Sequence, residues 1–226
     1  MINLKKIIVI TGHYGSGKTN VSANLALHLA EFGSVSIIDL DVVNPYFRAA
    51  DLRCTAEGDC SDAARFFSEK GVSIVASKYA NSSLDIPALG FAVTGAIKTS
   101  DYTVIDVGGD DEGAKALGRY LDILSPEQTD MFYVVNMYRY HTQKPQEALD
   151  LLRDIETVSG LKCTGIINNS HLCTQTTPET ITASLPYAEE IAKQAGVPLV
   201  FTTGNRELNC KNVNFPIDIL VKPIWV

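Results

Sequence analysis

The sequence predicts a three-layer α/β/α fold, with helices on both faces of a mostly parallel central sheet. Short runs of apolar and β-branched residues recur along the chain, and segments with apolar residues at helical spacing separate them. Strands that alternate with helices in this way form parallel sheets with right-handed crossovers. The length of 226 residues suits one large α/β domain and is too short for a second domain of ordinary size. We therefore expect a single domain over residues 1–226.

The first predicted strand, Ile7–Thr11, has the β-branched composition of a strand that is covered on both faces. The other predicted strands are Val35–Leu40, Val72–Ala76, Tyr102–Val107, Met131–Asn136, Gly165–Asn168, Val197–Thr202 and, as a weaker edge strand, Phe215–Val221. Helical spacing predicts a helix that follows the first strand and ends at Gly33, and further helices over Pro87–Ile97, Glu112–Leu124, Pro145–Val158 and Pro186–Ala195. The stretch before the third strand is polar and less regular.

The segment between the first strand and the first helix carries the clearest chemical motif. It reads Gly12-His13-Tyr14-Gly15-Ser16-Gly17-Lys18-Thr19 and fits G-x-x-x-x-G-K-[ST], a phosphate-binding loop. Glycines allow several backbone N–H groups to face one point, which the positive end of the following helix dipole also faces. We expect Lys18 to reach the terminal phosphates of a nucleotide and Thr19 to ligate the accompanying Mg²⁺, with Asn20 as a further nucleotide contact. The alternative is a glycine-rich turn with a solvated lysine.

Aspartates follow two of the other predicted strands, at the edge of the sheet where the loop lies. Asp39 and Asp106 end their strands, and Mg²⁺ on a polyphosphate needs such hard oxygen ligands. Asp41 and Asp110 lie slightly further out, where a carboxylate can orient an attacking water. Gly109 allows a backbone N–H to approach a terminal phosphate closely. The alternative for each aspartate is its ordinary frequency where a strand gives way to a turn.

Together these residues resemble the MinD/ParA/nitrogenase-iron-protein class of P-loop ATPases, over most of the chain from about Ile7 to Thr203. The matching parts are GHYGSGKT at Gly12–Thr19, Asn24-Leu25-Ala26, IIDLD at Ile37–Asp41, IDVGGDD at Ile105–Asp111, and Gly165-Ile166-Ile167-Asn168-Asn169. The resemblance implies ATP and Mg²⁺ as cofactors, a nucleotide-dependent homodimer, and switch segments at Asp41 and at Asp106 to Asp110. It also implies that Asn169, or failing that Asn168, contacts the base; loop capping is the alternative for both.

One position departs from this resemblance. The class usually has a second lysine just after the first glycine of the loop, which crosses a dimer interface to the partner's nucleotide, and this sequence has His13 there. A neutral imidazole cannot supply a permanent positive charge, although a protonated one near phosphates can. Hydrolysis is then activated differently, for example by Arg48 or by a partner's cation, or the protein is a slow switch. The alternative for His13 is a solvent-facing loop residue.

Several other residues carry weaker signals. Tyr46 and Phe47 in the segment Asn44–Arg48 suit either a contact surface that changes with nucleotide state or packing onto the core. Cys54 and Cys60 form a weak candidate pair for a metal or metallocluster. The remaining histidines lack partners at ligand spacing and are interpreted as structural; they are His28, His141 and His171.

Composition narrows the classes of function. A net charge of −7 and the absence of a Lys/Arg-rich block disfavour a nucleic-acid surface. No apolar run is long enough to cross a bilayer, so no membrane partner is expected. The 5 cysteines are scattered without a C-x-x-C pair, which favours reduced thiols and a cytoplasmic location.

Two classes of function remain as hypotheses. The first is a Mg²⁺-dependent ATPase that hydrolyses ATP slowly and whose nucleotide state controls self-association or a client protein, such as one in metal-centre maturation. Lys18, Asp41 and Asp110 are its predicted catalytic residues. The second is an ATP-dependent small-molecule kinase or ligase of the dethiobiotin-synthetase type. A DNA-partitioning or membrane-patterning module is disfavoured, because the chain has no basic amphipathic C-terminal helix. No guanine-reading Asn-Lys-x-Asp is present.

Overall fold

The computed structural model describes residues 4–40, 62–76, 86–109 and 111–220. Several residues singled out in the sequence lie outside these ranges: Asp41, Tyr46, Phe47, Arg48, Cys54, Cys60 and Asp110. The strands are β1 (Ile7–Gly12), β2 (Val35–Asp39), β3 (Val72–Ala76), β4 (Tyr102–Asp106), β5 (Thr129–Val135), β6 (Gly165–Asn168), β7 (Leu199–Asn205) and β8 (Phe215–Ile217). The helices are α1 (Lys18–Leu29), α2 (Asp62–Glu69), α3 (Ile86–Thr99), α4 (Asp111–Gly118), α5 (Pro145–Ser159) and α6 (Pro178–Ala195). Short 3₁₀ turns follow three of the strands: η2 (Tyr140–Thr142), η3 (Cys173–Gln175) and η4 (Arg206–Leu208).

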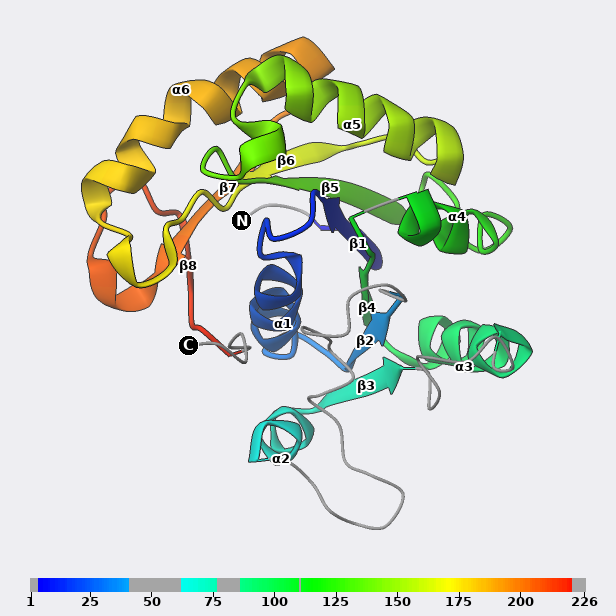
Figure 1. Cartoon of the computed structure of the whole chain (residues 1–226). Helices are drawn as coiled ribbons and strands as arrows, with labels where there is room; N and C mark the ends of the chain where they lie inside the picture. The colour runs from blue at the N-terminus through cyan, green and yellow to red at the C-terminus, as the bar shows by residue number, and fades with distance from the viewer. Residues whose placement is uncertain (1–3, 41–61, 77–85, 110, 221–226) are drawn as a thin grey trace.

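The strands form one 8-stranded sheet in the order β3-β2-β4-β1-β5-β6-β7-β8, and each neighbouring pair is parallel. Figure 1 shows the sheet curving around α1, while α3, α4, α5 and α6 cover its other face. The predicted three-layer fold with a parallel sheet is therefore confirmed. Because every strand runs the same way, the loops that follow them all emerge at one edge.

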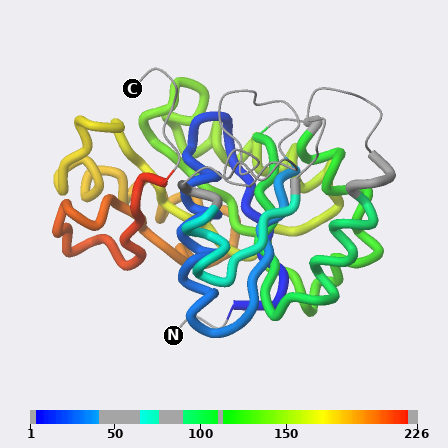
Figure 2. Tube along the Cα trace, turned by 90° about the horizontal axis from the view of Figure 1, so that it is seen from below, coloured from blue at the N-terminus to red at the C-terminus, as the bar shows by residue number. Residues whose placement is uncertain are grey.

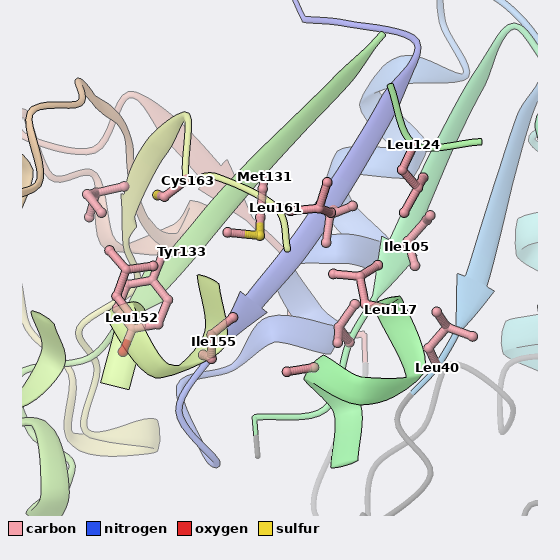
Figure 3. Packing of buried hydrophobic residues seen from close by; sticks show 14 of the residues in the cluster. Leu40, Ile105, Leu117, Leu124, Met131, Tyr133, Leu152, Ile155, Leu161 and Cys163 are labelled. Atoms are coloured by element: carbon pink, nitrogen blue, oxygen red, sulfur yellow. The ribbon is translucent and has the colours of Figure 1, made fainter. Parts of the chain in front are cut away.

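Each face of the sheet has its own hydrophobic core. One core joins the strands to α3, α4, α5 and α6, and the other joins them to α1 and to Phe67 of α2. Figure 3 shows part of the first core, where Leu117 lies near Ile105 and Leu152 lies near Tyr133. The central strand β1 is buried along its whole length, which matches its unbroken apolar sequence. A strand packed on both faces holds the loop that follows it on a rigid base.

Helix α6 begins earlier than the predicted Pro186–Ala195, at Pro178. The Thr177 side chain caps it, accepting a hydrogen bond from the Thr180 backbone N–H, and a proline is well tolerated in the first turn that follows. Pro186 lies inside the helix, where it removes one backbone hydrogen bond, yet buried Ile181 and Ser184 anchor the preceding turns. The prediction mistook a proline inside the helix for the one at its start.

Helices α4 and α2 also differ from the prediction. Helix α4 ends at Gly118 instead of Leu124, and the chain continues in turns with hydrogen bonds such as that from Tyr120 N–H to the Leu117 carbonyl. Helix α2 forms in the polar stretch before β3, where the sequence pattern predicted no regular element. Its residue Phe67 is buried in the α1 core, so tertiary packing supports this short helix. In the described part of the chain, no helix is both long and apolar enough to span a bilayer.

Candidate functional site

The loop between β1 and α1 has a backbone shape that only glycine allows at several positions. Gly12, Gly15 and Gly17 have φ angles of 148°, 74° and 86°, values that side-chain-bearing residues rarely adopt. A Cβ atom on Gly12 would also collide with the Val134 carbonyl of the adjacent strand β5. The Ser16 backbone N–H donates to the His13 carbonyl across 3.1 Å and closes the turn. The predicted phosphate-binding loop therefore has the curled backbone that its sequence implies, with Tyr14 exposed at its tip.

Lys18 and Thr19 are the first residues of α1 and are each 6% exposed. The Lys18 Nζ atom donates to the His13 carbonyl oxygen across 3.2 Å, so the ammonium group folds back over the loop. First-turn amides of a helix point towards its N-terminus, where its dipole is positive. A cation and a helix N-terminus thus face the same curve of backbone, which is the chemistry of an anion site.

Asn20 follows in the first turn of α1, and its side chain contacts the segment after β8. Its Oδ1 atom accepts a hydrogen bond from the Leu220 backbone N–H across 2.9 Å. Asn24, one turn later, exchanges hydrogen bonds with the backbone of Asp218. The C-terminal segment is therefore held against the helix that begins at the loop, and nucleotide contact by Asn20 stays a prediction.

Asp39 and Asp106 end adjacent strands in direct register, β2 beside β4. Neighbouring strands lie about 5 Å apart, so the two carboxylates share one edge of the sheet. Asp39 is 6% exposed and Asp106 is 1% exposed; Oδ1 of Asp106 accepts a hydrogen bond from the Ser22 hydroxyl of α1 across 3.2 Å. Asp106 is also in register with Ile10 of β1, close to the start of the loop.

The donor set around Thr19 fits Mg²⁺ held jointly with a nucleotide. A hydroxyl and carboxylate oxygens, as on Thr19, Asp39 and Asp106, are the hard ligands that this ion takes alongside phosphate oxygens. Among the described residues, no group of three or more His, Cys, Asp or Glu side chains could hold a metal by itself. The described part of the site would therefore hold Mg²⁺ together with further oxygen ligands, such as those of a bound polyphosphate.

Gly109 packs the segment after β4 against the loop. A Cβ atom at this position would collide with the Gly12 carbonyl and would come within 2.6 Å of the Tyr14 backbone nitrogen. The Val107 backbone N–H donates to the Ile10 carbonyl across 3.0 Å and fixes the same approach. The backbone at residue 109 thus lies next to the first half of the loop, and its contact with a phosphate stays a prediction.

Asn168 and Asn169, the predicted base contacts, are buried and engaged with the protein. Asn169 Nδ2 donates to the Ser16 carbonyl of the loop across 2.6 Å, and its Oδ1 accepts from Thr203 of β7. Asn168 Nδ2 donates to the Ser184 hydroxyl across 2.9 Å. Asn169 therefore braces the loop from β6, and the predicted contact with a base stays a prediction.

A second loop, after β5, lies beside the phosphate loop. The sequence alone assigned no functional residue to it. Buried Asn136 ties it to the loop after β6, because its Oδ1 accepts from the backbone N–H groups of Tyr138 at 3.0 Å and His171 at 3.3 Å. Figure 2 shows the turn after β1 and the segment after β5 at the same edge of the molecule. The position of this second loop brings Arg139 and His141 to the rim of the site.

Three histidines lie around this rim. The sequence placed His13 in the phosphate loop, and His141 and His171 were interpreted as structural. The rings of His13 and His141 have centroids 5.7 Å apart. Burial, with smaller contributions from Lys18, His141 and Arg139, lowers the pKa of His13, although its hydrogen bond to the Tyr14 carbonyl opposes the shift. Burial and the Arg139 charge lower the pKa of His171 to about 4. A signal for His141 and His171 was available, since both follow predicted strands by a few residues and so reach the same sheet edge.

No protein-family model matches the sequence, and no curated protein matches it. Among solved structures, the cell division protein FtsY from Thermotoga maritima aligns with a TM-score of 0.56 at 18% identity, over 99% of this chain and 66% of that chain. The fold is that of the P-loop NTPases. The signal recognition particle receptor FtsY from Elizabethkingia anophelis, in complex with GDP, has a TM-score of 0.59 at 16% identity and covers 95% of this chain and 61% of that chain. Chloroplast FtsY from Physcomitrella patens has a TM-score of 0.58 at 17% identity, over 99% and 63%.

These comparisons show that the chain has a P-loop NTPase fold. They do not show to which family within that fold it belongs. At 16 to 18% identity the similarity shows the fold alone, and this chain spans less than two thirds of each FtsY chain. The narrower resemblance to the MinD/ParA/nitrogenase-iron-protein class is not confirmed, because the similar structures described above are FtsY proteins, which form a different branch of P-loop proteins.

Proposed function

We propose that this protein binds Mg²⁺-ATP, hydrolyses it slowly and acts as a nucleotide-controlled switch. The observation that supports this proposal is the geometry of residues 12–19. Three glycines with positive φ curl the backbone, and Lys18 lies folded over it at the start of α1. Buried carboxylates of Asp39 and Asp106 end the two strands nearest to β1 on one side. This arrangement suits a polyphosphate with a divalent cation.

Each group has a definite task in phosphoryl transfer, which depends on positioning and charge more than on covalent chemistry. The loop amides and Lys18 offset negative charge on the β- and γ-phosphates. Thr19, Asp39 and Asp106 would hold Mg²⁺, which supplies further charge neutralisation when bound. Asp41 and Asp110 lie outside the described residues, and we assign them the orientation of the attacking water.

ATP is proposed over GTP because the resemblance to the MinD/ParA/nitrogenase-iron-protein class implies ATP. The sequence also contains no guanine-reading Asn-Lys-x-Asp. One of the similar structures, the Elizabethkingia anophelis FtsY, holds GDP. The binding experiment described below therefore measures the preference between ATP and GTP directly.

The switch part of the proposal concerns association. Asp41 and the segment around Asp110 follow β2 and β4, so both segments start from strands that end beside the phosphate loop. Segments in this position change order with the γ-phosphate in nucleotide switches. We propose a homodimer, or a complex with a client protein, that forms with ATP and dissociates with ADP. Light scattering tests the homodimer by comparing the molar mass of the protein in the presence of ATP with its molar mass in the presence of ADP.

No observation favours the alternative of a small-molecule kinase or ligase. That activity needs a second substrate pocket beside the phosphate loop. Among the described residues, one hollow of about 1020 Å³ is lined by the second half of α1 and by residues of α2 and β8. It includes none of residues 12–19.

The experiment that tests the proposed function compares the wild type with Lys18→Ala by calorimetric titration with Mg²⁺-ATP and Mg²⁺-GTP. Removing a buried ammonium from the phosphates is expected to weaken ATP binding at least about 100-fold. Lys162→Ala is the matched control, because this exposed lysine pairs with Glu156 at 2.7 Å on the surface. Equal ATP affinity in Lys18→Ala and wild type would show that the loop is not the nucleotide site. Binding of GTP alone would overturn the choice of base.

A further inference from the structure

Arg139 occupies a position next to the phosphate loop that the sequence interpretation did not use. It lies four residues after the end of β5 and caps the short turn η2. Strand β5 is the direct neighbour of β1, with Val134 in register with Gly12. The loop that carries Arg139 and the loop of residues 12–19 therefore leave adjacent strands at the same edge, as Figure 2 shows.

The backbone that presents Arg139 is fixed on both sides. Its N–H donates to the Asn136 carbonyl across 3.2 Å, and its carbonyl accepts from the Thr142 N–H across 3.0 Å. The Thr142 hydroxyl also donates to the Asn136 carbonyl across 3.2 Å, and Thr142 is buried. Arg139 therefore projects from a braced turn, so little conformational entropy would be lost when it contacts a ligand.

The Arg139 side chain passes directly over Gly15 of the phosphate loop. A Cβ atom built on Gly15 would lie 3.3 Å from Arg139 Nε and 3.4 Å from its Cζ. The Nε atom is buried and has no hydrogen-bond partner among the described residues. A buried cationic donor without an acceptor is unfavourable, so this N–H is suited to an oxygen that a ligand brings.

Arg139 can supply a second permanent positive charge beside the loop, which the neighbouring histidines do not supply. In the resembling class, a second lysine follows the first glycine, and here that residue is His13, whose burial favours the neutral ring. His171, which feels the charge of Arg139, is likewise neutral near pH 7, since burial and Arg139 itself lower its pKa to about 4. The guanidinium is always charged and presents a planar set of donors that matches phosphate oxygens.

We propose that Arg139 contacts the bound polyphosphate from within the same chain and supplies the second permanent positive charge of the site. This inference rests on the proposed function insofar as the polyphosphate is that of a nucleotide. With this charge in place, the cation that the resemblance to the MinD/ParA/nitrogenase-iron-protein class implied from a partner subunit would not be required. The contact is made through Nε and the guanidinium fork, above the backbone of Gly15.

Two substitutions at Arg139 separate charge from packing. Arg139→Met keeps a long apolar stem over Gly15 and removes the guanidinium, while Arg139→Lys keeps the charge and loses the fork. Titration with Mg²⁺-ATP and with Mg²⁺-tripolyphosphate is the readout, with the melting temperature of the nucleotide-free proteins alongside. Arg153→Ala is the matched control, because Arg153 is an exposed arginine on α5 that pairs with Asp150.

Arg139→Met is expected to weaken binding of both ligands about 10- to 100-fold, and Arg139→Lys to recover part of that loss. The melting temperature should stay within about 2 °C of wild type, since the Nε atom has no partner to lose. Affinities of Arg139→Met within twofold of wild type would overturn the inference. A lowered melting temperature with no recovery in Arg139→Lys would also overturn it, by showing that Arg139 only supports the loop.

The ligand pair and Lys18→Ala keep this inference distinct from the proposed function. Binding of ATP that depends on Lys18 but not on Arg139 would leave the function standing and end the inference. Binding of tripolyphosphate that depends on Arg139, without binding of ATP or GTP, would support the inference and refute the nucleotide function.

Discussion

His171 is an imidazole held in one protonation state by its surroundings. Its Nδ1 atom accepts from the Cys173 N–H across 3.2 Å, and a Cβ atom on Gly17 would lie 3.3 Å from its Nε2. Burial first, and then the charge of Arg139, lower its pKa from 6.5 to about 4. Protonation would place a second cation beside Arg139 in a poorly solvated position. The neutral ring is therefore part of the folded structure at neutral pH.

The sign of the resulting pH effect follows from the lowered pKa. Unfolded His171 binds a proton near its ordinary pKa of 6.5 and the folded ring does so near 4, so its stabilising contribution is full above 6.5 and is lost as the pH falls towards 4. We expect wild type to lose about 2 kcal/mol of unfolding free energy from this group between about pH 8 and about pH 5. Urea denaturation of wild type and His171→Asn at both pH values measures it. An equal fall in both proteins would contradict the assignment.

The residues that the motif names were predictable, whereas for those that border it the sequence indicated at most the shared sheet edge. Gly12 and Gly17 occupy the glycine positions of a pattern whose backbone geometry is well understood, and the structure has positive φ at both of them and at Gly15. Arg139 and Asn136 belong to no such pattern. Their importance depends on β5 being the neighbour of β1, which local sequence does not reveal.

At the level of elements, Asn24 joins helix α1 to the C-terminal segment. Its Nδ2 donates to the carbonyls of Asn20 at 2.7 Å and Asp218 at 2.9 Å, and its Oδ1 accepts from the Asp218 N–H at 2.8 Å. Asn24 is 6% exposed, so these bonds are largely shielded from water. The segment after β8 is thereby fixed to the helix whose first turn carries Lys18.

Asn24→Ala is expected to lower the free energy of unfolding by about 2 to 3 kcal/mol, because it leaves backbone groups of a shielded segment without partners. Urea denaturation followed by circular dichroism gives the value. Asn212→Ala is the control: Asn212 is exposed and donates one hydrogen bond, to the Thr182 hydroxyl, so its loss should cost less than about 1 kcal/mol. Similar small losses in both variants would show that Asn24 does not hold the segment.

Most elements were predictable from periodicity, and the errors have physical causes. β3 and β6 have the predicted bounds, because the ends of a short apolar run between polar residues define where the strand begins and ends. Helix α6 was placed eight residues short since Pro186 imitates a helix start. Helix α2 is short and buries Phe67 in the core that contains α1, a tertiary contact that local sequence does not reveal.

At the scale of the whole molecule, strand order creates the site. Placing β4 between β2 and β1 brings Asp39 and Asp106 into register beside the phosphate loop, and placing β5 on the other side of β1 brings Arg139 over Gly15. The sequence predicted parallel strands and a shared edge, which was sufficient for the fold and for the carboxylates. Which loops become neighbours across that edge depends on crossovers that periodicity does not specify.

The central claim is that residues 12–19 wrap a polyphosphate, with Asp39 and Asp106 beside its cation. The most direct measurement is a crystal structure of the protein with Mg²⁺ and a non-hydrolysable ATP analogue. The account predicts phosphate oxygens within hydrogen-bonding distance of the loop amides and of Lys18 Nζ, and Mg²⁺ ligated by the Thr19 hydroxyl on the side of the two aspartates. A nucleotide bound elsewhere, with no phosphate in this loop, would contradict it.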